Sequence, residues 1–270
     1  MSWNPDPRFA TQSVQTTPTL LILTALATEA DSLVSLGKPE VGLVPPPGEL
    51  RRLFCPRPAE PGRPEEVWVG YTGLGRAVTR AAFLPFKGEK APRRVIFAGV
   101  SGALRGDLDT GDVVMLTGAF SDEPGSELAA TSPGLTAALE AALEQSGINA
   151  RRRGTSLEVS RIVSTPDEKR ALARRYPDAC VVSMEDHAAI TAARELGAEV
   201  AALRIVLDRL VDSVPDLSPG LDGAGRPRAL KLAAHLVRQP GALRALPGLA
   251  RSFGIAKAVL DRALHAALDL

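Results

Sequence analysis

The sequence predicts an α/β protein with a mainly parallel, partly mixed central sheet flanked by helices. Apolar runs of strand length alternate with segments of helical spacing over about 190 residues, a pattern typical of a parallel sheet with helices on both faces. The run TLLILTAL at 19–26 is continuously apolar, as expected for a strand buried on both faces. An apolar content of 45% and a charged content of 23% in 270 residues indicate a folded domain and exclude wholesale disorder.

In the first half of the chain, each expected strand leads toward a helix or a turn. The strand at 19–26 precedes a short helix at 27–36, and the run VWVGYT at 67–72 precedes a segment of helical spacing at 74–86. Two further strands are expected, RVIFA at 94–98, closed by Gly99, and DVVMLT at 112–117. Their aliphatic and β-branched composition favours strands over helices.

The second half continues the alternation up to Asp208. An Ala/Leu/Glu-rich helix is expected at 133–146, where Gly147 ends it, and two short β runs follow at 155–164. The remaining elements alternate in the same way and are a charged helix at 167–175, a strand at 179–183, a helix at 184–196 and a strand at 199–206.

Three segments depart from the alternation. Residues 1–18 are polar and carry three prolines, so we expect a flexible leader before an α/β domain at 19–212. Residues 37–64 hold eight of the 22 prolines, which predicts an irregular insertion because proline fixes φ and removes a hydrogen-bond donor. Residues 213–270 are expected to form a loop and a helical extension of the same domain.

The extension is basic although the formal net charge of the chain is +1. From Arg226 to Arg262 eight residues are basic and one is acidic, with Leu, Ala and Val at most other positions, which is typical of a cationic amphipathic helix. The prolines predict two helices in 226–268, broken near Pro240 and Pro247. Three roles are open: packing on the domain, a subunit interface in a homo-oligomer, and peripheral contact of residues 226–262 with an anionic membrane.

Composition argues against several classes of protein. The 32 Lys and Arg residues balance 31 Asp and Glu residues, so we expect no nucleic-acid partner. Two Cys and three His are too few for a disulfide scaffold or a Cys/His metal centre, and we expect no metal and no cofactor. No apolar run approaches the about 20 residues of a spanning helix, and no signal peptide is evident, so a cytoplasmic protein is expected.

Several residues with chemical potential follow the predicted strands. Glu29, the pair Met184 and Glu185, and Asp208 each come after a strand, as do glycine-rich turns at 73–75 and 99–102. In open α/β sheets the ligand binds at the carboxyl ends of the strands, so we expect a site there. The turn at 73–75 is not a dinucleotide fingerprint, because the third glycine and the acidic residue after the next strand are missing.

Four segments, in order, resemble the bacterial methylthioadenosine/S-adenosylhomocysteine nucleosidases and, more widely, the nucleoside phosphorylase superfamily. They are TALATEADSL, YTGLGR, FAGVSGALRGDLDTGDVV, and VVSMED followed by LRIVLD, and together they span residues 20–208. The Met-Glu-x-His run and the tail from Ser213 are most similar to the hopanoid-associated phosphorylase branch, which is associated with release of adenine from adenosylhopane. The resemblance implies an enzyme that cleaves the N-glycosidic bond of an adenine-type purine nucleoside.

Asp208 matches the catalytic acid of the resembled nucleosidases. A departing purine needs a proton on N7, and a buried carboxyl with a raised pKa can hold that proton at neutral pH. Two structural alternatives remain, a loop or helix-capping aspartate and an ion pair with Arg209. The residue before the acid is usually Ser in the resembled enzymes, whereas Leu207 stands here and cannot form a side-chain hydrogen bond.

The resemblance also implies roles for the other residues at the strand ends. Glu185 would bind the ribose hydroxyls and Met184 would pack against the ribose, although a glutamate in a first helical turn also favours the helix dipole. Glu29 would position or deprotonate the attacking water, the alternative being an exposed first-turn glutamate. Further residues of the substrate pocket would be Thr72, Gly73, Val100, Ser101 and Gly102. His187 is expected to be structural, because positions i and i+2 point to different helix faces.

Water and phosphate are both open as the acceptor. The backbone N–H of Gly75 and the nearby cation Arg76 are the candidates for binding inorganic phosphate. Hexameric purine phosphorylases carry an Arg two residues before the glycine matched here by Gly99, and Phe97 stands at that position. Hydrolysis is therefore favoured, with a phosphorolytic transferase and a catalytically impaired nucleoside-binding protein as alternatives.

Overall fold

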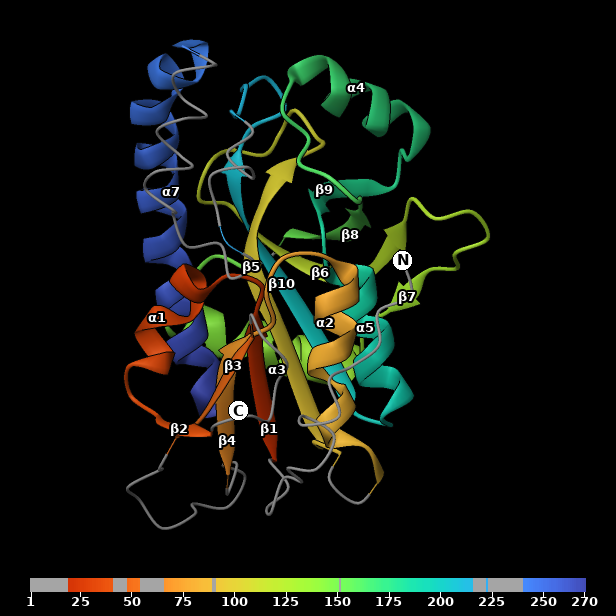
Figure 1. Ribbon diagram of the computed structural model, residues 1–270, viewed down its shortest axis with the longest axis vertical. Helices are drawn as coiled ribbons and strands as arrows, with labels where there is room; N and C mark the ends of the chain where they lie inside the picture. The colour runs from red at the N-terminus through yellow and green to blue at the C-terminus, as the bar shows by residue number, and fades with distance from the viewer. Residues whose placement is uncertain are drawn as a thin grey trace.

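The computed structural model describes residues 19–40, 48–53, 66–88, 91–150, 152–215, 222 and 240–270. Within them a ten-stranded mixed sheet lies between helices on both faces (Figure 1). The strands are β1 Leu20–Thr24, β2 Lys38–Glu40, β3 Glu49–Leu53, β4 Val67–Tyr71, β5 Arg94–Ala103, β6 Val113–Ser121, β7 Ala129–Ala130, β8 Arg152–Glu158, β9 Ala179–Ser183 and β10 Glu199–Asp208. The helices are α1 Ala27–Val34, α2 Arg76–Ala82, η2 Leu84–Phe86, α3 Pro133–Gln145, α4 Pro166–Arg175, α5 Asp186–Glu195, α7 Pro240–Ala266 and η5 Ala267–Asp269.

Strand β5 organises the sheet, because it pairs with three other strands. Its first part runs parallel to β1, it runs parallel to β10 from Arg94 to Gly102, and its end at Gly102 and Ala103 pairs antiparallel with β9. Strand β10 pairs in turn with β6, β6 with β8, and β8 with β9. The five strands β5, β10, β6, β8 and β9 therefore close into a ring, while β1, β4, β3 and β2 extend the sheet on the other side.

The sheet is buried on both faces, which explains the continuous apolar runs. Leu21 and Leu23 of β1 point into one core cluster, and Leu20 and Ile22 point into another. The first cluster includes residues of α5 and the segment after α2, and the second includes residues of α1, α3 and α7. Figure 1 shows α2 and α5 on one side of the sheet and α1 and α7 on the other. The predicted fold class is confirmed.

The proline-rich segment at 37–64 is not irregular throughout. Strand β2 pairs antiparallel with β3, and β3 pairs antiparallel with β4. Strand β2 contains Pro39 and stands at the end of the strand order, a position where a missing ladder hydrogen bond costs little. The prediction of an insertion without regular structure is therefore wrong for 38–40 and 49–53, and 41–47 and 54–64 lie outside the described residues.

Three other local predictions are wrong. Residues 99–102, expected as a glycine-rich turn after a strand that Gly99 closes, lie within β5, which continues to Ala103. Residues 155–164 form the end of a single strand, β8, and a loop that leads to α4. The β8–β9 ladder ends at Glu158 and Ser183, so β9 offers no partner for a second strand. The expected break at Pro247 is also absent, because α7 continues through this proline.

Helix α7 packs its apolar face on the domain. Ala256, Leu260, Ala263 and Leu264 are buried in the same cluster as the helices α1 and α3. Among its cations, Lys257 forms an ion pair with Asp261. Residues 1–18 and 226–239 of the expected leader and extension lie outside the described residues. No helix in the described part of the chain is both long and apolar enough to span a membrane.

Candidate active site

A pocket of about 180 Å³ lies where the ends of β5 and β10 and the segment after β9 come together. The pairing that closes the ring sets this location, because Gly102 of β5 is in register with Asp208 of β10 and with Val182 of β9. The predicted site residues that line the pocket are Glu29, Val100, Ser101, Gly102, Met184, Glu185 and Asp208. Segments far apart in the sequence therefore line the same pocket.

Glu185 is the N-cap residue of α5, separated from the end of β9 by Met184, and its side chain lines the pocket instead of capping the helix. Oε1 accepts a hydrogen bond of 2.8 Å from the backbone N–H of Gly75, and Oε2 accepts one of 3.3 Å from Met184 N–H. Burial raises the pKa of Glu185 to about 7, against the opposing charge of Arg204. The carboxylate is therefore held rigidly by backbone donors and titrates near neutral pH.

Glu29 lies in the first turn of α1 and is 2% exposed, so the alternative of a solvent-exposed glutamate is wrong. Oε1 accepts a hydrogen bond of 2.8 Å from Val100 N–H, and Oε2 accepts one of 2.9 Å from Leu26 N–H. Burial raises the pKa of the Glu29 carboxyl, while Arg204 and the backbone donors oppose the shift. Helix capping and a place in the pocket are therefore combined in one side chain.

Arg204 of β10 is a buried cation in the pocket wall. Its Nε donates a 2.8 Å hydrogen bond to Asp186 Oδ1, and its guanidinium lies 4.9 Å from the centre of the Phe97 ring. Asp186 Oδ2 has no hydrogen-bond partner among the described residues. Asp186 holds the guanidinium in place, and the Arg204 charge also interacts with Glu29 and Glu185.

Asp208 ends β10 and is 7% exposed. Its Oδ2 forms an ion pair with Lys169 Nζ of α4. Burial raises the pKa of Asp208, and the Lys169 charge opposes the shift. The alternative of an ion pair with Arg209 is wrong, since Arg209 pairs with Asp212 at 3.0 Å.

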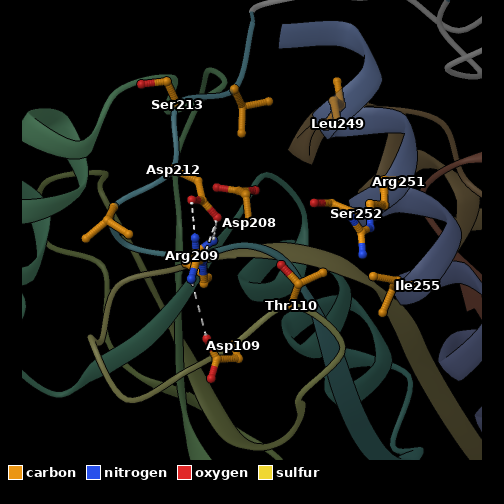
Figure 2. A pocket seen from close by; sticks show the side chains of 13 residues that line it. Asp109, Thr110, Asp208, Arg209, Asp212, Ser213, Leu249, Arg251, Ser252 and Ile255 are labelled. Atoms are coloured by element: carbon orange, nitrogen blue, oxygen red, sulfur yellow. Dashed lines mark hydrogen bonds and ion pairs between the residues drawn. The ribbon is translucent and has the colours of Figure 1, made fainter.

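A larger cavity of about 780 Å³ lies on the other side of the loop that follows β10. Figure 2 shows Arg209 between Asp109 and Asp212, with Ser252 and Ile255 of α7 across the cavity. Asp208 and Val214 line both this cavity and the smaller pocket. The loop 209–214 is therefore the wall between the two spaces.

The strand-to-helix turn after β4 borders the pocket, which Leu74 of this turn lines. Thr72 is fully buried, and its Oγ1 lies 3.2 Å from Thr79 Oγ1. Gly73 and Gly75 adopt φ values of 96° and 93°, which glycine permits at no steric cost. Thr72 and Gly73 do not line the pocket, but their turn presents the Gly75 N–H to Glu185.

The predicted phosphate ligand Arg76 is occupied by carboxylates. Its guanidinium lies 2.7 Å from Asp122, 2.5 Å from Glu123 and 3.2 Å from Glu158. Asp122 and Glu123 alone balance the guanidinium charge, which leaves no positive charge in excess for a phosphate dianion. Arg76 also does not line the pocket.

Ser101 carries an unsatisfied group at the pocket wall. Its side chain is buried, and Oγ has no hydrogen-bond partner among the described residues. A buried hydroxyl without a partner is costly unless a ligand or water completes it. His187, by contrast, lies outside the pocket, and its Nε2 is 3.1 Å from Ser126 Oγ and 3.0 Å from the Glu127 carbonyl.

Comparison of the sequence with protein families identifies the family of this chain. The sequence profile described as "Phosphorylase superfamily" matches residues 65–239. The chain belongs to the phosphorylase superfamily. A search of curated proteins found no match.

Solved structures share the fold of this phosphorylase-superfamily chain at low sequence identity. Futalosine hydrolase of Helicobacter pylori is 16% identical with a TM-score of 0.62, over 91% of this chain and 97% of that one. The methylthioadenosine/S-adenosylhomocysteine nucleosidase of Neisseria meningitidis, in complex with methylthio-immucillin-A, is 16% identical with a TM-score of 0.64, over 93% and 98%. The corresponding nucleosidase of Colwellia psychrerythraea, in complex with adenine, is 14% identical with a TM-score of 0.67, over 94% and 95%.

Two charged residues of this superfamily member were not predicted as site residues. Lys169 was assigned only to a charged helix, and it is fully buried against Asp208. Arg204 stands in the segment LRIVLD, where only Asp208 is predicted as a site residue, and it lines the pocket. Lys169 stands between Glu168 and Arg170 in a charged segment, so its sequence gives no local signal of burial. Arg204 stands between apolar residues of its strand, and only the fold shows which groups its guanidinium meets. Within the described residues no group of three or more Asp, Glu, His or Cys could hold a metal ion.

Proposed function

We propose that this chain cleaves the N-glycosidic bond of a purine nucleoside and releases the base by hydrolysis. The observation that carries the proposal is the meeting of Glu29, Glu185 and Asp208 in one pocket, each with a pKa raised by burial. Perturbed carboxylates that share a pocket are typical of acid–base catalysis. The family and the fold support the same chemistry.

Asp208 is proposed as the general acid. The C–N bond of a nucleoside breaks more easily when the leaving purine is protonated, because a purine anion is a poor leaving group. A carboxyl that is mostly buried holds its proton at a higher pH than an exposed one. The raised pKa of Asp208 therefore suits a proton donor near neutral pH.

Glu185 is proposed to bind the ribose hydroxyls, with Met184 packed against the sugar. An ionised Glu185 would accept hydrogen bonds from the hydroxyls and stabilise the positive charge that develops on the sugar. The unpaired Ser101 Oγ offers a further hydrogen bond to a bound ligand. The Gly75 N–H fixes the carboxylate in advance, so little reorganisation is needed on binding.

Glu29 is proposed to position and deprotonate the attacking water. Its raised pKa makes it a better base than an exposed glutamate, and its two backbone hydrogen bonds hold its orientation. In the transfer, one O–H proton of water passes to Glu29 as the oxygen bonds to the anomeric carbon, and the purine leaves with the proton from Asp208. Atoms and charges balance without a further reactant.

Water is favoured over phosphate as the acceptor on electrostatic grounds. Arg76 is paired with three carboxylates, and the pocket cation Arg204 is paired with Asp186. Neither guanidinium has an excess of positive charge for a phosphate dianion. The three solved structures named above are two nucleosidases and a hydrolase.

The substrate class proposed is an adenine nucleoside with a 5′ substituent, and the resemblance to the hopanoid-associated branch favours an apolar, lipid-linked one. Base release from adenosine, methylthioadenosine and an apolar 5′-substituted adenosine, each with and without phosphate, tests acceptor and substrate together. Release that is independent of phosphate is expected. Release that requires phosphate and forms ribose 1-phosphate would favour the phosphorylase instead, and binding of analogues without any release would favour a binding protein.

The role of Asp208 is tested by Asp208→Asn. We expect turnover to fall about 10²- to 10⁴-fold, the usual contribution of a general acid, while binding of an adenosine analogue persists. Asp167→Asn at the exposed start of α4 is the matched control, and its turnover should stay near that of the native chain. Near-normal turnover in Asp208→Asn would refute the assignment.

A further inference from the structure

We propose that Lys169 is the positioning residue of Asp208, holding one carboxylate oxygen so that the other oxygen carries the proton toward the substrate. The inference rests on the proposed role of Asp208 as the general acid. Lys169 lies on α4, 39 residues before Asp208 in the sequence, and has no exposed surface. A buried ammonium without partners would be strongly destabilising.

All three donors of the Lys169 ammonium have acceptors. Nζ contacts Asp208 Oδ2, and it donates hydrogen bonds of 2.6 Å to the Arg209 carbonyl and 3.0 Å to the Asp212 carbonyl. An ammonium has three donors and no acceptor, so the set is complete. The same cation therefore fixes the acid and the loop that follows it.

Helix α4 is itself anchored to that loop. The backbone N–H of Val214 donates a 2.9 Å hydrogen bond to the Ser164 carbonyl, just before the helix. Thr165 caps α4 by accepting from Glu168 N–H at 3.3 Å. Residues 209–214 are thus tied to α4 at two places, on the wall between the two cavities.

The residue before Asp208 cannot orient its carboxylate, so Lys169 is the side chain that does. Leu207 has no polar side-chain atom and therefore cannot orient the carboxylate. The charged groups that face Asp208 are Lys169 from α4 and Asp212 from the loop. Across the pocket lie Glu29 and Glu185, which face Arg204.

The contact decides which oxygen of Asp208 carries the proton. Because the ammonium has no lone pair, Oδ2 must act as the acceptor toward Lys169. The proton of a neutral Asp208 therefore sits on Oδ1. Burial raises the pKa of Asp208 and the Lys169 charge limits that rise, so removing the cation should raise the pKa further.

The test compares Lys169→Met with Arg170→Met, its exposed neighbour on α4 that pairs with Asp167. Release of adenine from methylthioadenosine is followed from pH 5 to pH 10. In Lys169→Met we expect kcat at neutral pH to fall about 100-fold, the effect of a misplaced catalytic group, with KM nearly unchanged. The alkaline fall in kcat, which follows deprotonation of Asp208, should move to higher pH. Arg170→Met should match the native chain.

Three outcomes separate this inference from its alternatives. An unchanged rate and profile in Lys169→Met, with Asp208→Asn inactive, would overturn the inference alone. A fall in kcat by the same factor at every pH, with no shift of the alkaline fall, would also overturn it, because Lys169 would then be merely structural. Normal turnover in Asp208→Asn would instead remove the proposed function. Should Lys169→Met fail to fold, Lys169→Arg keeps the charge, and its alkaline limb should stay at the native pH.

Discussion

At the scale of single residues, the buried pair of Arg204 and Glu29 in the pocket wall fits only because residue 99 is a glycine. Gly99 of β5 lies against the Arg204 guanidinium, which a Cβ at this position would overlap. The same Cβ would lie 3.0 Å from Glu29 Oε1. The glycine therefore admits a cation and an anion to the sheet interior, where their attraction is little screened.

Replacing Gly99 with alanine should disrupt this network. We expect Gly99→Ala to lower the free energy of unfolding by about 1–3 kcal/mol, the usual cost of overpacking, and to reduce base release through Glu29. Urea unfolding measures the first effect. Gly134→Ala in α3 is the control, since a Cβ there meets nothing within 4 Å and alanine favours a helix. Equal stability of the two variants would contradict the steric role of Gly99.

At the scale of elements, α7 shows tertiary packing overriding a helix breaker. Pro247 lies inside the helix and is exposed, while Ala256, Leu260 and Leu264 are buried against the domain. A proline in a helix interior removes one hydrogen bond and crowds the preceding turn. The sequence therefore predicts a break, and the buried face of the helix compensates for its cost.

Replacing Pro247 should increase the stability of the fold. We expect Pro247→Ala to raise the free energy of unfolding by up to about 3 kcal/mol, the penalty of an interior proline. Pro133→Ala is the matched control, because Pro133 is the first residue of α3, where a proline has no hydrogen bond to lose. Chemical denaturation of both variants measures the free energy of unfolding. An increase in Pro247→Ala no larger than that in Pro133→Ala would show that Pro247 does not destabilise α7.

At the scale of the whole molecule, buried acids make stability depend on pH. Burial raises the pKa of Glu158 and of Glu185 to about 7, whereas an unfolded glutamate ionises near its ordinary value of about 4.3. Between these values the folded chain binds more protons than the unfolded chain. The free energy of unfolding from these groups therefore decreases as the pH rises through this window.

Glu158 isolates this effect, because it lies outside the pocket and is 1% exposed. We expect the native chain to have a lower Tm at pH 8 than at pH 5. Glu158→Gln should reduce this pH dependence, and the corresponding change in the free energy of unfolding should be at most about 3 kcal/mol. Glutamine can still accept the 2.8 Å hydrogen bond from Ala188 N–H. Glu199→Gln at an exposed site is the control, and the same drop in both variants would contradict the assignment to Glu158.

The sequence by itself predicted the fold class and the position of the acids after their strands. Apolar runs report burial locally, so β1, β4, β9 and β10 were predicted close to their observed bounds. Only the first half of β5 was predicted, because its second half is rich in glycine. Strand β3 was missed because its sequence, ELRRL, has charged residues at three of five positions and follows prolines. The order of strands and the ring that joins Gly102 to Asp208 carry no local pattern and came only from the structure.

Only the tertiary structure decided which charges act on which. Lys169 and Asp208 are 39 residues apart, and Arg76 meets Asp122 and Glu158 across different strands and loops. The pKa of a carboxyl depends on how far water is excluded and on which charge lies beside it. Both are properties of distant segments brought together, so the sequence names the acids, and the fold sets their protonation and gives each its partner.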